Sequence, residues 1–185
     1  LKRAEDKYNS DGTIQFGAAP PFRCGIIVCA MRFFNEGFSP YFDDYVTAHR
    51  YRSEREIIAL ASDDLARAAV AIRDRHAIPL VGFDLAGQEA GYPAAAHRAA
   101  YEYAHRHFLN KTVHAGEAFG PESIFQAITE CHADRIGHGT WLFSTRRIQD
   151  PSITDRRAYV DNLIRYVGEH RITLEVCLTS NQQTI

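Results

Sequence analysis

Short apolar runs alternate along the chain with longer amphipathic stretches. Each run has an apolar centre, and most end in Gly, Asp, Glu, His, Ser or Asn. Buried parallel strands have this pattern, with functional polar groups gathered at their carboxyl ends. We therefore predict five strands, within Arg23–Arg32, Leu80–Glu89, Lys111–Glu117, Asp134–Gly139 and Thr173–Asn181.

The stretches between these runs carry helix signals. Ser62 followed by two acids is typical of a helix start. Gly120-Pro121 is typical of another, because proline at the first helical position loses no needed hydrogen bond. A third helix is expected to end near His170. The predicted apolar stripes are Leu65, Ala69 and Ile72; Ile124, Ala127, Ile128 and Cys131; and Tyr159, Leu163, Ile164 and Val167.

Strands that alternate with helices predict an α/β fold with a parallel sheet, for which two architectures compete. A doubly wound sheet often carries a glycine-rich phosphate loop, and neither G-x-G-x-x-G nor G-x-x-x-x-G-K is present. A (β/α)₈ barrel places polar residues at the ends of several strands, as here, but takes about 250 residues and eight strands. We therefore expect part of such a barrel, with about five of its eight strands.

Composition favours one globular domain over residues 1–185. The chain has a formal net charge of −2, with 45% hydrophobic and 24% charged residues, which argues against disorder. Near-neutral charge gives no electrostatic basis for binding nucleic acid or an anionic membrane. No apolar run approaches the ~18–20 residues that a membrane span needs. The four cysteines form no C-x-x-C pair, so a cysteine-based zinc site is not expected.

The two ends suggest an internal piece of a longer protein. The chain starts at Leu1, and its only methionine, Met31, lies inside an apolar run. It stops at Ile185, directly after a polar loop where a helix is expected to follow. We therefore expect truncation at both ends, with the cytoplasm as the default compartment.

His114-Ala115-Gly116-Glu117 is the most informative segment. A neutral imidazole at a strand end can bind a metal, and Gly116 lets the backbone turn so that Glu117 enters the same site. A carboxylate beside a metal can move protons between an activated water and a leaving group. Taken alone, however, these four residues favour a structural histidine.

Three further segments end strands with polar groups, and each has a plain structural alternative. In R-I-G-H-G, the glycines around His138 suit either an exposed ligand-facing ring or an ordinary loop. In Asp84–Glu89, Gly87 could offer its backbone N–H to a ligand, or the acids could complement a helix dipole. In Glu175–Asn181, helix capping is the favoured interpretation.

The order of these segments carries more weight than any one of them. D-L-A-G-x-E, H-A-G-E, R-I-G-H-G and E-V-C-L-T-S-N follow one another between Asp84 and Asn181. In this order they strongly resemble the adenosine deaminase family. The resemblance implies a (β/α)₈ barrel hydrolase acting on a cyclic amidine C–N bond. It would use Zn²⁺ to convert adenosine to inosine and ammonia, with a purine nucleoside as its substrate.

The resemblance also implies roles for particular residues. By similarity, His114 is a zinc ligand, Glu117 protonates purine N1, and His138 orients the activated water and stabilises the charged transition state. Gly87 binds purine N3 through its backbone, and Asp84 supports the end of its strand.

The sequence also departs from the family pattern. The family's H-x-H pair on the first strand and its aspartate on the last strand do not appear. The only H-x-H, His105 and His107, lies in a predicted helix, and residues two apart on a helix face different directions, so we interpret both as surface residues. The five strands correspond to the family's third to seventh. Three zinc ligands are therefore expected outside this chain, which by itself should be inactive.

Two other functions stay open. A related deaminase could act on adenine, AMP or an N6-modified purine nucleotide, because its motifs are shared. A non-catalytic purine-binding protein could have lost its zinc site. The stretch Thr140–Asp155 is longer than expected and is a candidate for altering substrate fit, although Trp141 is interpreted as a packing residue. The oligomeric state stays undetermined.

Overall fold

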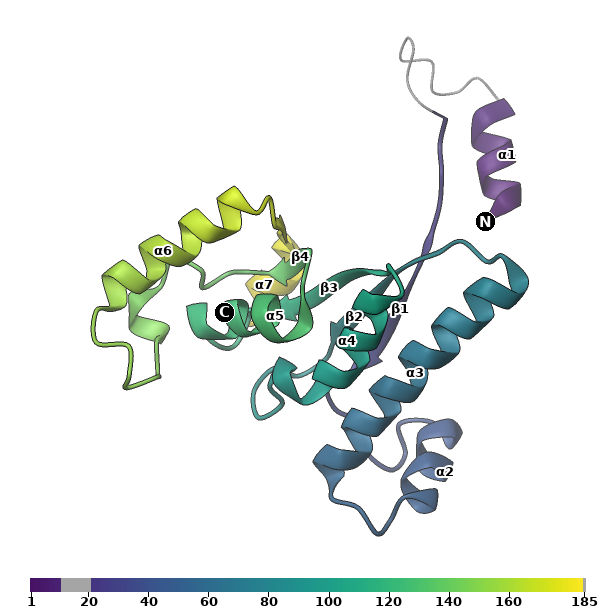
Figure 1. Ribbon diagram of the computed structural model, residues 1–185, viewed down its shortest axis with the longest axis horizontal. Coiled ribbons are helices and arrows are strands. Elements are labelled where there is room, and N and C mark those ends of the chain that lie inside the picture. The colour runs from purple at the N-terminus through teal and green to yellow at the C-terminus, as the bar shows by residue number, and fades with distance from the viewer. Residues whose placement is uncertain (11–20, 185) are drawn as a thin grey trace.

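The computed structural model describes residues 1–10 and 21–184, and its centre is a five-stranded parallel sheet (Figure 1). The strands pair in the order in which they follow along the chain, each parallel to the next. This confirms the predicted parallel α/β sheet. The strands are β1 (Ile26–Met31), β2 (Leu80–Ala86), β3 (Asn110–Ala115), β4 (Arg135–His138) and β5 (Thr173–Glu175).

Three helices cover one face of the sheet. α3 contacts β1 and β2, α4 and α5 contact β3, and α6 packs against α5. In Figure 1, α3 and α2 lie at one end of the molecule and α6 lies at the other. The helices are α1 (Lys2–Ser10), α2 (Pro40–Ala48), α3 (Glu54–His76), α4 (Arg98–Arg106), α5 (Pro121–Cys131), α6 (Arg156–Glu169) and α7 (Leu178–Thr184), with short 3₁₀ turns η1 (Ala94–His97) and η2 (Thr145–Arg147).

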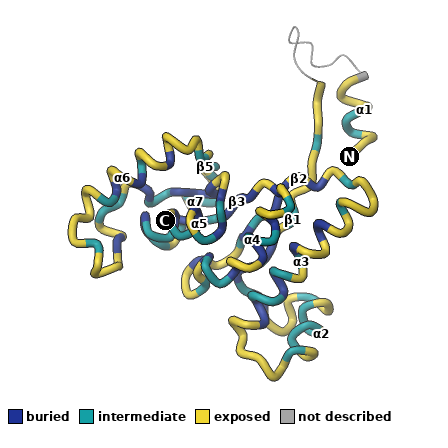
Figure 2. Tube along the Cα trace, in the orientation of Figure 1, coloured by how far each residue is buried: buried dark blue, intermediate teal, exposed yellow. Residues whose placement is uncertain are grey.

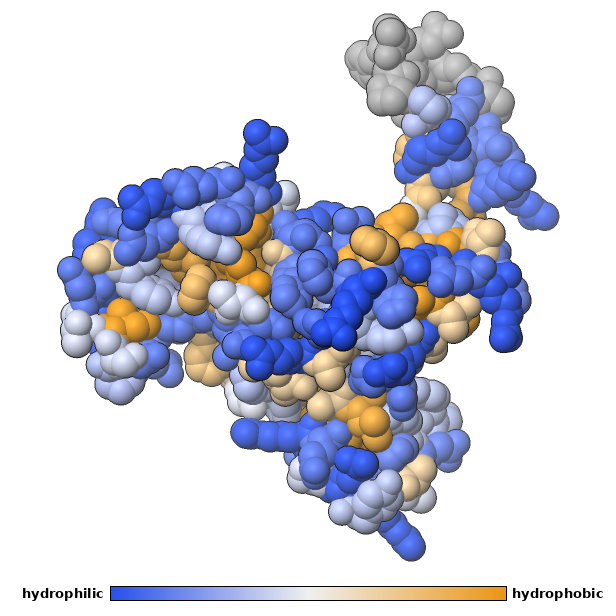
Figure 3. Space-filling model, viewed as in Figure 1, coloured by the Kyte–Doolittle hydropathy of each residue, from blue (hydrophilic) through white to orange (hydrophobic). Residues whose placement is uncertain are grey.

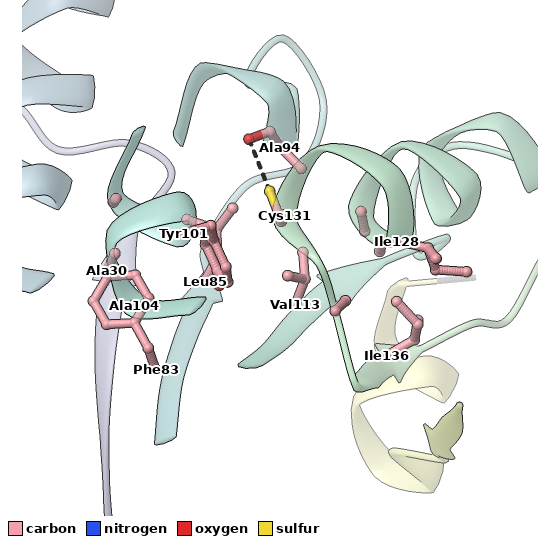
Figure 4. Close-up of a cluster of buried hydrophobic side chains, with 14 of the residues drawn as sticks. Ala30, Phe83, Leu85, Ala94, Tyr101, Ala104, Val113, Ile128, Cys131 and Ile136 are labelled. Atoms are coloured by element: carbon pink, nitrogen blue, oxygen red, sulfur yellow. Dashed lines mark hydrogen bonds between the residues drawn. The ribbon is translucent and has the colours of Figure 1, made fainter. Parts of the chain in front are cut away.

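The core lies between the sheet and these helices. Phe83, Val113 and Ile136 are fully buried there, and in Figure 4 they lie with side chains from α4 and α5. Tyr101 of α4 is also fully buried, with its ring 5.2 Å from that of Phe83 and its hydroxyl donating to the Thr112 carbonyl at 2.7 Å. Because strand residues alternate in direction, the next positions along the chain, including Asp84 and His114, lie on the opposite face.

The predicted start of the longest helix at Ser62 is wrong. α3 begins at Glu54, where Ser53 and Glu56 form a reciprocal capping box that satisfies the first backbone N–H groups. Ser62 lies inside the helix and is buried, where its hydroxyl donates to the Ile58 carbonyl at 3.1 Å and contacts His97 Nδ1 at 2.7 Å. The acids after Ser62 lie inside the helix instead of at its end: Asp63 is half-buried and Asp64 is exposed.

The predicted start of α5 and end of α6 are confirmed, but the predicted last strand is too long. α5 starts at Pro121 with Gly120 as its N-cap, and α6 ends beside His170, both as expected. The last strand, however, ends at Glu175, and α7 follows it almost at once. Asn181 therefore lies within α7 instead of capping it. The sequence did not distinguish a strand from a short helix here because the run is short and mixed.

The amino-terminal part extends away from the sheet. Figure 2 shows exposed and half-buried residues along α1. Figure 3 shows apolar side chains where residues 21–25 lead into the sheet. The backbone N–H of Cys24 donates to the Glu5 carboxylate at 2.7 Å, which ties this segment to α1. Across the described residues, no helix is both long and apolar enough to span a bilayer.

His97 makes the stability of the fold sensitive to acid. Burial, and then the charge of Arg32, lower the pKa of His97 to about 3, whereas an unfolded histidine titrates near 6.5. Below pH 6.5 the unfolded chain therefore binds a proton that the native chain does not. The free energy of unfolding should fall by up to about 1.4 kcal/mol per pH unit from this residue as pH drops towards 3.

Urea unfolding of the wild type and His97→Gln between pH 7 and pH 4 measures this effect. The difference in slope isolates His97, because the other acid-sensitive groups are shared. His76→Gln, at an exposed position near the end of α3, is the control and should keep the wild-type slope. Equal slopes for the wild type and His97→Gln would show that His97 is not held neutral.

Candidate active site

The polar residues predicted to end strands meet at the carboxyl edge of the sheet. His114 of β3 places Nε2 3.4 Å from Asp84 Oδ2 of β2. Glu117, just after β3, places Oε2 3.6 Å from His138 Nε2 of β4. The two imidazole rings lie 5.2 Å apart and nearly perpendicular. The structure thus brings together four side chains from three segments that are far apart in sequence.

Left-handed backbone at the strand ends produces this convergence. Strict alternation from Val113 and Ile136 would put Glu117 and His138 on the face that the helices cover. Gly116, at φ +72°, and His138 itself, at φ +69°, interrupt the alternation. A Cβ on Gly116 would also lie 2.6 Å from the side chain of Ile124, so only glycine fits that turn.

His138 is the most buried of these side chains, with 5% of its surface exposed. Its Nδ1 lies 2.7 Å from Asn181 Oδ1 of α7. An amide oxygen accepts, so Nδ1 donates to Asn181 and leaves Nε2 as the ring nitrogen that faces Glu117. The sequence predicts a capping role for Asn181, and only its position in α7 reveals this contact.

His114 is held by its ring and by its backbone. The hydrogen bond to Asp84 raises the pKa of the His114 imidazole, against the opposing effect of burial. Its carbonyl accepts from the guanidinium of Arg32 at 2.7 Å, and Arg32 is completely buried at the end of β1. Cys29 of β1 donates its thiol proton to Asp84 Oδ2 at 3.4 Å, and burial raises the pKa of this thiol to about 12. Neither Arg32 nor Cys29 was singled out from the sequence.

Gly87 follows β2 in a left-handed conformation, at φ +99°. A Cβ there would lie 3.4 Å from the end of Met31 and 3.6 Å from the backbone nitrogen of Arg32. The position therefore favours glycine for reasons of backbone geometry and space. His105 and His107 lie at the far end of α4, away from the site, as interpreted from the sequence.

The described residues offer only part of a metal site. Within residues 1–10 and 21–184, no three His, Cys, Asp or Glu side chains are arranged to hold a metal ion. The His114 imidazole is half-buried at the strand edge, and its chemistry suits one zinc ligand. A tetrahedral site needs further ligands beyond those that this cluster supplies.

A parallel sheet with helices on one face and polar side chains at successive strand ends is characteristic of a (β/α)₈ barrel, and this chain forms part of one. The family model described as adenosine deaminase matches residues 45–185. The chain belongs to the adenosine deaminase family.

Known members of the family are similar in sequence. Adenosine deaminase 1 of Streptomyces coelicolor is 42% identical over 138 residues, which covers 74% of this chain and 34% of that protein. Adenosine deaminase of Mycobacteroides abscessus is 44% identical over 127 residues, covering 68% and 33% respectively. The chain thus spans about a third of the length of the curated relatives it matches.

Solved structures of deaminases share the fold. An adenine deaminase from Arthrobacter aurescens superposes with a TM-score of 0.53 at 20% identity, covering 86% of this chain and 36% of that one. The Arabidopsis N6-mAMP deaminase superposes with a TM-score of 0.50 at 26% identity, covering 69% and 32%.

Gly137 leaves room for the ring of His114. The two residues pair across β3 and β4, and a Cβ on Gly137 would lie 2.7 Å from the His114 ring. Gly137→Ala should therefore displace this imidazole and shift its NMR signals. Gly168→Ala is the control, because nothing lies within 4 Å of a Cβ built there. Unchanged His114 signals in Gly137→Ala would contradict the proposed close packing.

Proposed function

We propose that this chain is the catalytic core segment of a zinc-dependent deaminase that hydrolyses adenosine to inosine and ammonia. The observation that carries the proposal is the approach of Glu117 Oε2 to His138 Nε2, at 3.6 Å, beside the ring of His114. A carboxyl group and two imidazoles are the groups needed to move protons at a hydrolytic centre. The family match supports adenosine as the first substrate to assay.

In this proposal Glu117 donates a proton to purine N1, which makes C6 more electrophilic. Water adds at C6 and gives up one proton, which passes to the 6-amino group so that it leaves as ammonia. The remaining proton of that water returns to the Glu117 carboxylate as the C6 carbonyl forms. His138 holds the attacking water through Nε2, because Nδ1 is engaged by Asn181. Gly87 binds purine N3 through its backbone N–H, and Asp84 orients the His114 ring. These roles distribute proton transfer, water positioning and substrate binding over three strand ends.

His114 would hold the zinc ion together with ligands from parts of the protein outside this cluster. Bound zinc supplies the reaction with a water whose pKa is lowered towards about 7. A polypeptide limited to the described residues should be inactive, because they present no complete metal site.

Glu117→Gln tests the acid role. An amide cannot donate the required proton, so kcat for adenosine should fall about 10²–10⁴-fold in the protein expressed with all flanking sequence that its gene encodes. Ammonia release measures the rate, with adenine and AMP assayed alongside. Glu130→Gln, at a half-buried position on α5, is the control and should keep wild-type activity. Near-normal turnover by Glu117→Gln would exclude Glu117 as the proton donor.

The zinc content of the same protein tests His114. The wild type should carry about one zinc ion per chain, and His114→Ala should lose it, because tetrahedral sites depend on every ligand. His105→Ala removes an exposed imidazole from α4 and should leave the metal content unchanged. Inductively coupled plasma mass spectrometry gives the stoichiometry. A wild-type protein without zinc, or a His114→Ala variant that retains it, would refute this assignment.

A further inference from the structure

Glu89 is a buried carboxylate for which the proposed chemistry has no role. It follows β2, and 4% of its surface is exposed. Burying an unpaired carboxylate is costly in free energy, so the hydrogen-bond partners of Glu89 indicate which segment it holds in place. The Ser123 hydroxyl donates to Oε1, and four consecutive backbone N–H groups donate to the two carboxylate oxygens: Gly116 at 2.9 Å, Glu117 at 3.1 Å, Ala118 at 2.6 Å and Phe119 at 3.1 Å.

These bonds keep Glu89 ionised. Burial acts to raise the pKa of its carboxyl group, but hydrogen bonds from Ser123 and from the backbone of residues 116–119 outweigh it, and the pKa is lowered. A neutral side chain could not accept all of these hydrogen bonds. A glutamine amide has one oxygen to accept with, and its NH₂ group would face N–H donors.

The backbone carbonyls on the same segment are held from the other side. Trp141 donates its backbone N–H to the Gly116 carbonyl at 3.1 Å and its indole Nε1–H to the Glu117 carbonyl at 2.8 Å. The Arg147 guanidinium lies over the indole, 4.2 Å from the ring centroid. Glu117 therefore has its N–H fixed by Glu89 and its C=O fixed by Trp141. Trp141 is thus more than the packing residue that the sequence suggested.

Capping of α5 does not account for this arrangement. Ser123 lies in the first turn of α5, so one of the five hydrogen bonds contributes to that helix end. The other four converge on the turn after β3, whose central side chain reaches His138. The Glu89 carboxylate therefore binds mainly the backbone of this turn and only secondarily the start of α5.

We propose that Glu89 is a positioning residue for Glu117: its buried carboxylate fixes the turn at residues 116–119 so that the Glu117 side chain reaches His138. The inference rests on the proposed function, in which Glu117 transfers a proton. Displacing a reacting group by about 1 Å can cost about 10²-fold in rate, so positioning of this kind has a measurable effect.

Glu89→Gln tests the proposal in the protein expressed with its flanking sequence. Glu122→Gln is the matched control, because it makes the same change on a nearby carboxylate that binds the backbone of Gln149 and Asp150 instead of the turn. We expect kcat for adenosine to fall about 10- to 100-fold in Glu89→Gln with KM changed less than about threefold. Glu122→Gln should keep both constants near wild type.

A spectroscopic readout does not depend on catalysis. The Trp141 indole N–H is bonded to the Glu117 carbonyl, and its NMR signal can be assigned by its loss in Trp141→Phe. This signal should shift in Glu89→Gln and stay in place in Glu122→Gln. If Glu89→Gln does not fold, Glu89→Asp keeps the charge on a shorter side chain and should show an intermediate fall in kcat.

The outcomes separate the two proposals. An active wild type with unchanged kcat or an unchanged Trp141 signal in Glu89→Gln refutes the positioning role alone, as does wild-type turnover by Glu89→Asp. A wild type that deaminates no purine refutes the proposed function and this inference with it. A fall in kcat at nearly constant KM, together with a shifted Trp141 signal, supports both.

Discussion

Parallel pairing of the strands is the constraint on which the rest of the structure depends. Because β2, β3 and β4 run in one direction, their carboxyl ends meet at one edge, and residues more than twenty positions apart become neighbours. The pairing of His114 with Gly137 is the clearest consequence, since it places an imidazole over the one residue type without a side chain. α3, α4 and α5 then cover the opposite face and bury apolar residues of β1, β2 and β3.

Two buried charged side chains, Arg32 and Glu89, hold the backbone at the strand ends in place. Arg32 joins β1 to β3 through the His114 carbonyl, and its guanidinium also donates to the Tyr92 carbonyl. Glu89 gathers the backbone N–H groups of the turn after β3. Burying such groups costs free energy that hydrogen bonds offset, and Glu89 uses both carboxylate oxygens for this, whereas Arg32 bonds through its two terminal nitrogens. Because these groups bind the backbone of His114 and Glu117, their hydrogen bonds fix the positions of these two residues at the sheet edge.

The same edge of the sheet also relates this chain to the adenosine deaminase family. The chain spans about a third of its curated relatives, yet that third includes four consecutive strand ends with polar side chains. The face opposite the helices carries Asp84 and His114, and in a (β/α)₈ barrel that face lines the interior.

Sequence and tertiary structure determined different parts of this protein. The sequence by itself determined the parallel α/β class, the existence of the five strands, and the polar residues near the ends of β2, β3 and β4, because periodicity and polar strand ends are local signals. It could also have shown the true start of α3, since Ser53 and Glu56 have the spacing of a capping box.

Only the tertiary structure decided the partners of those residues. Asn181 meets His138, Glu89 meets the turn after β3, and Trp141 meets Glu117. Each of these contacts joins segments from different strands, so it depends on distances that no local pattern encodes. Helical or strand propensity acts within a few residues, whereas a hydrogen bond across strand ends exists only after the sheet has formed.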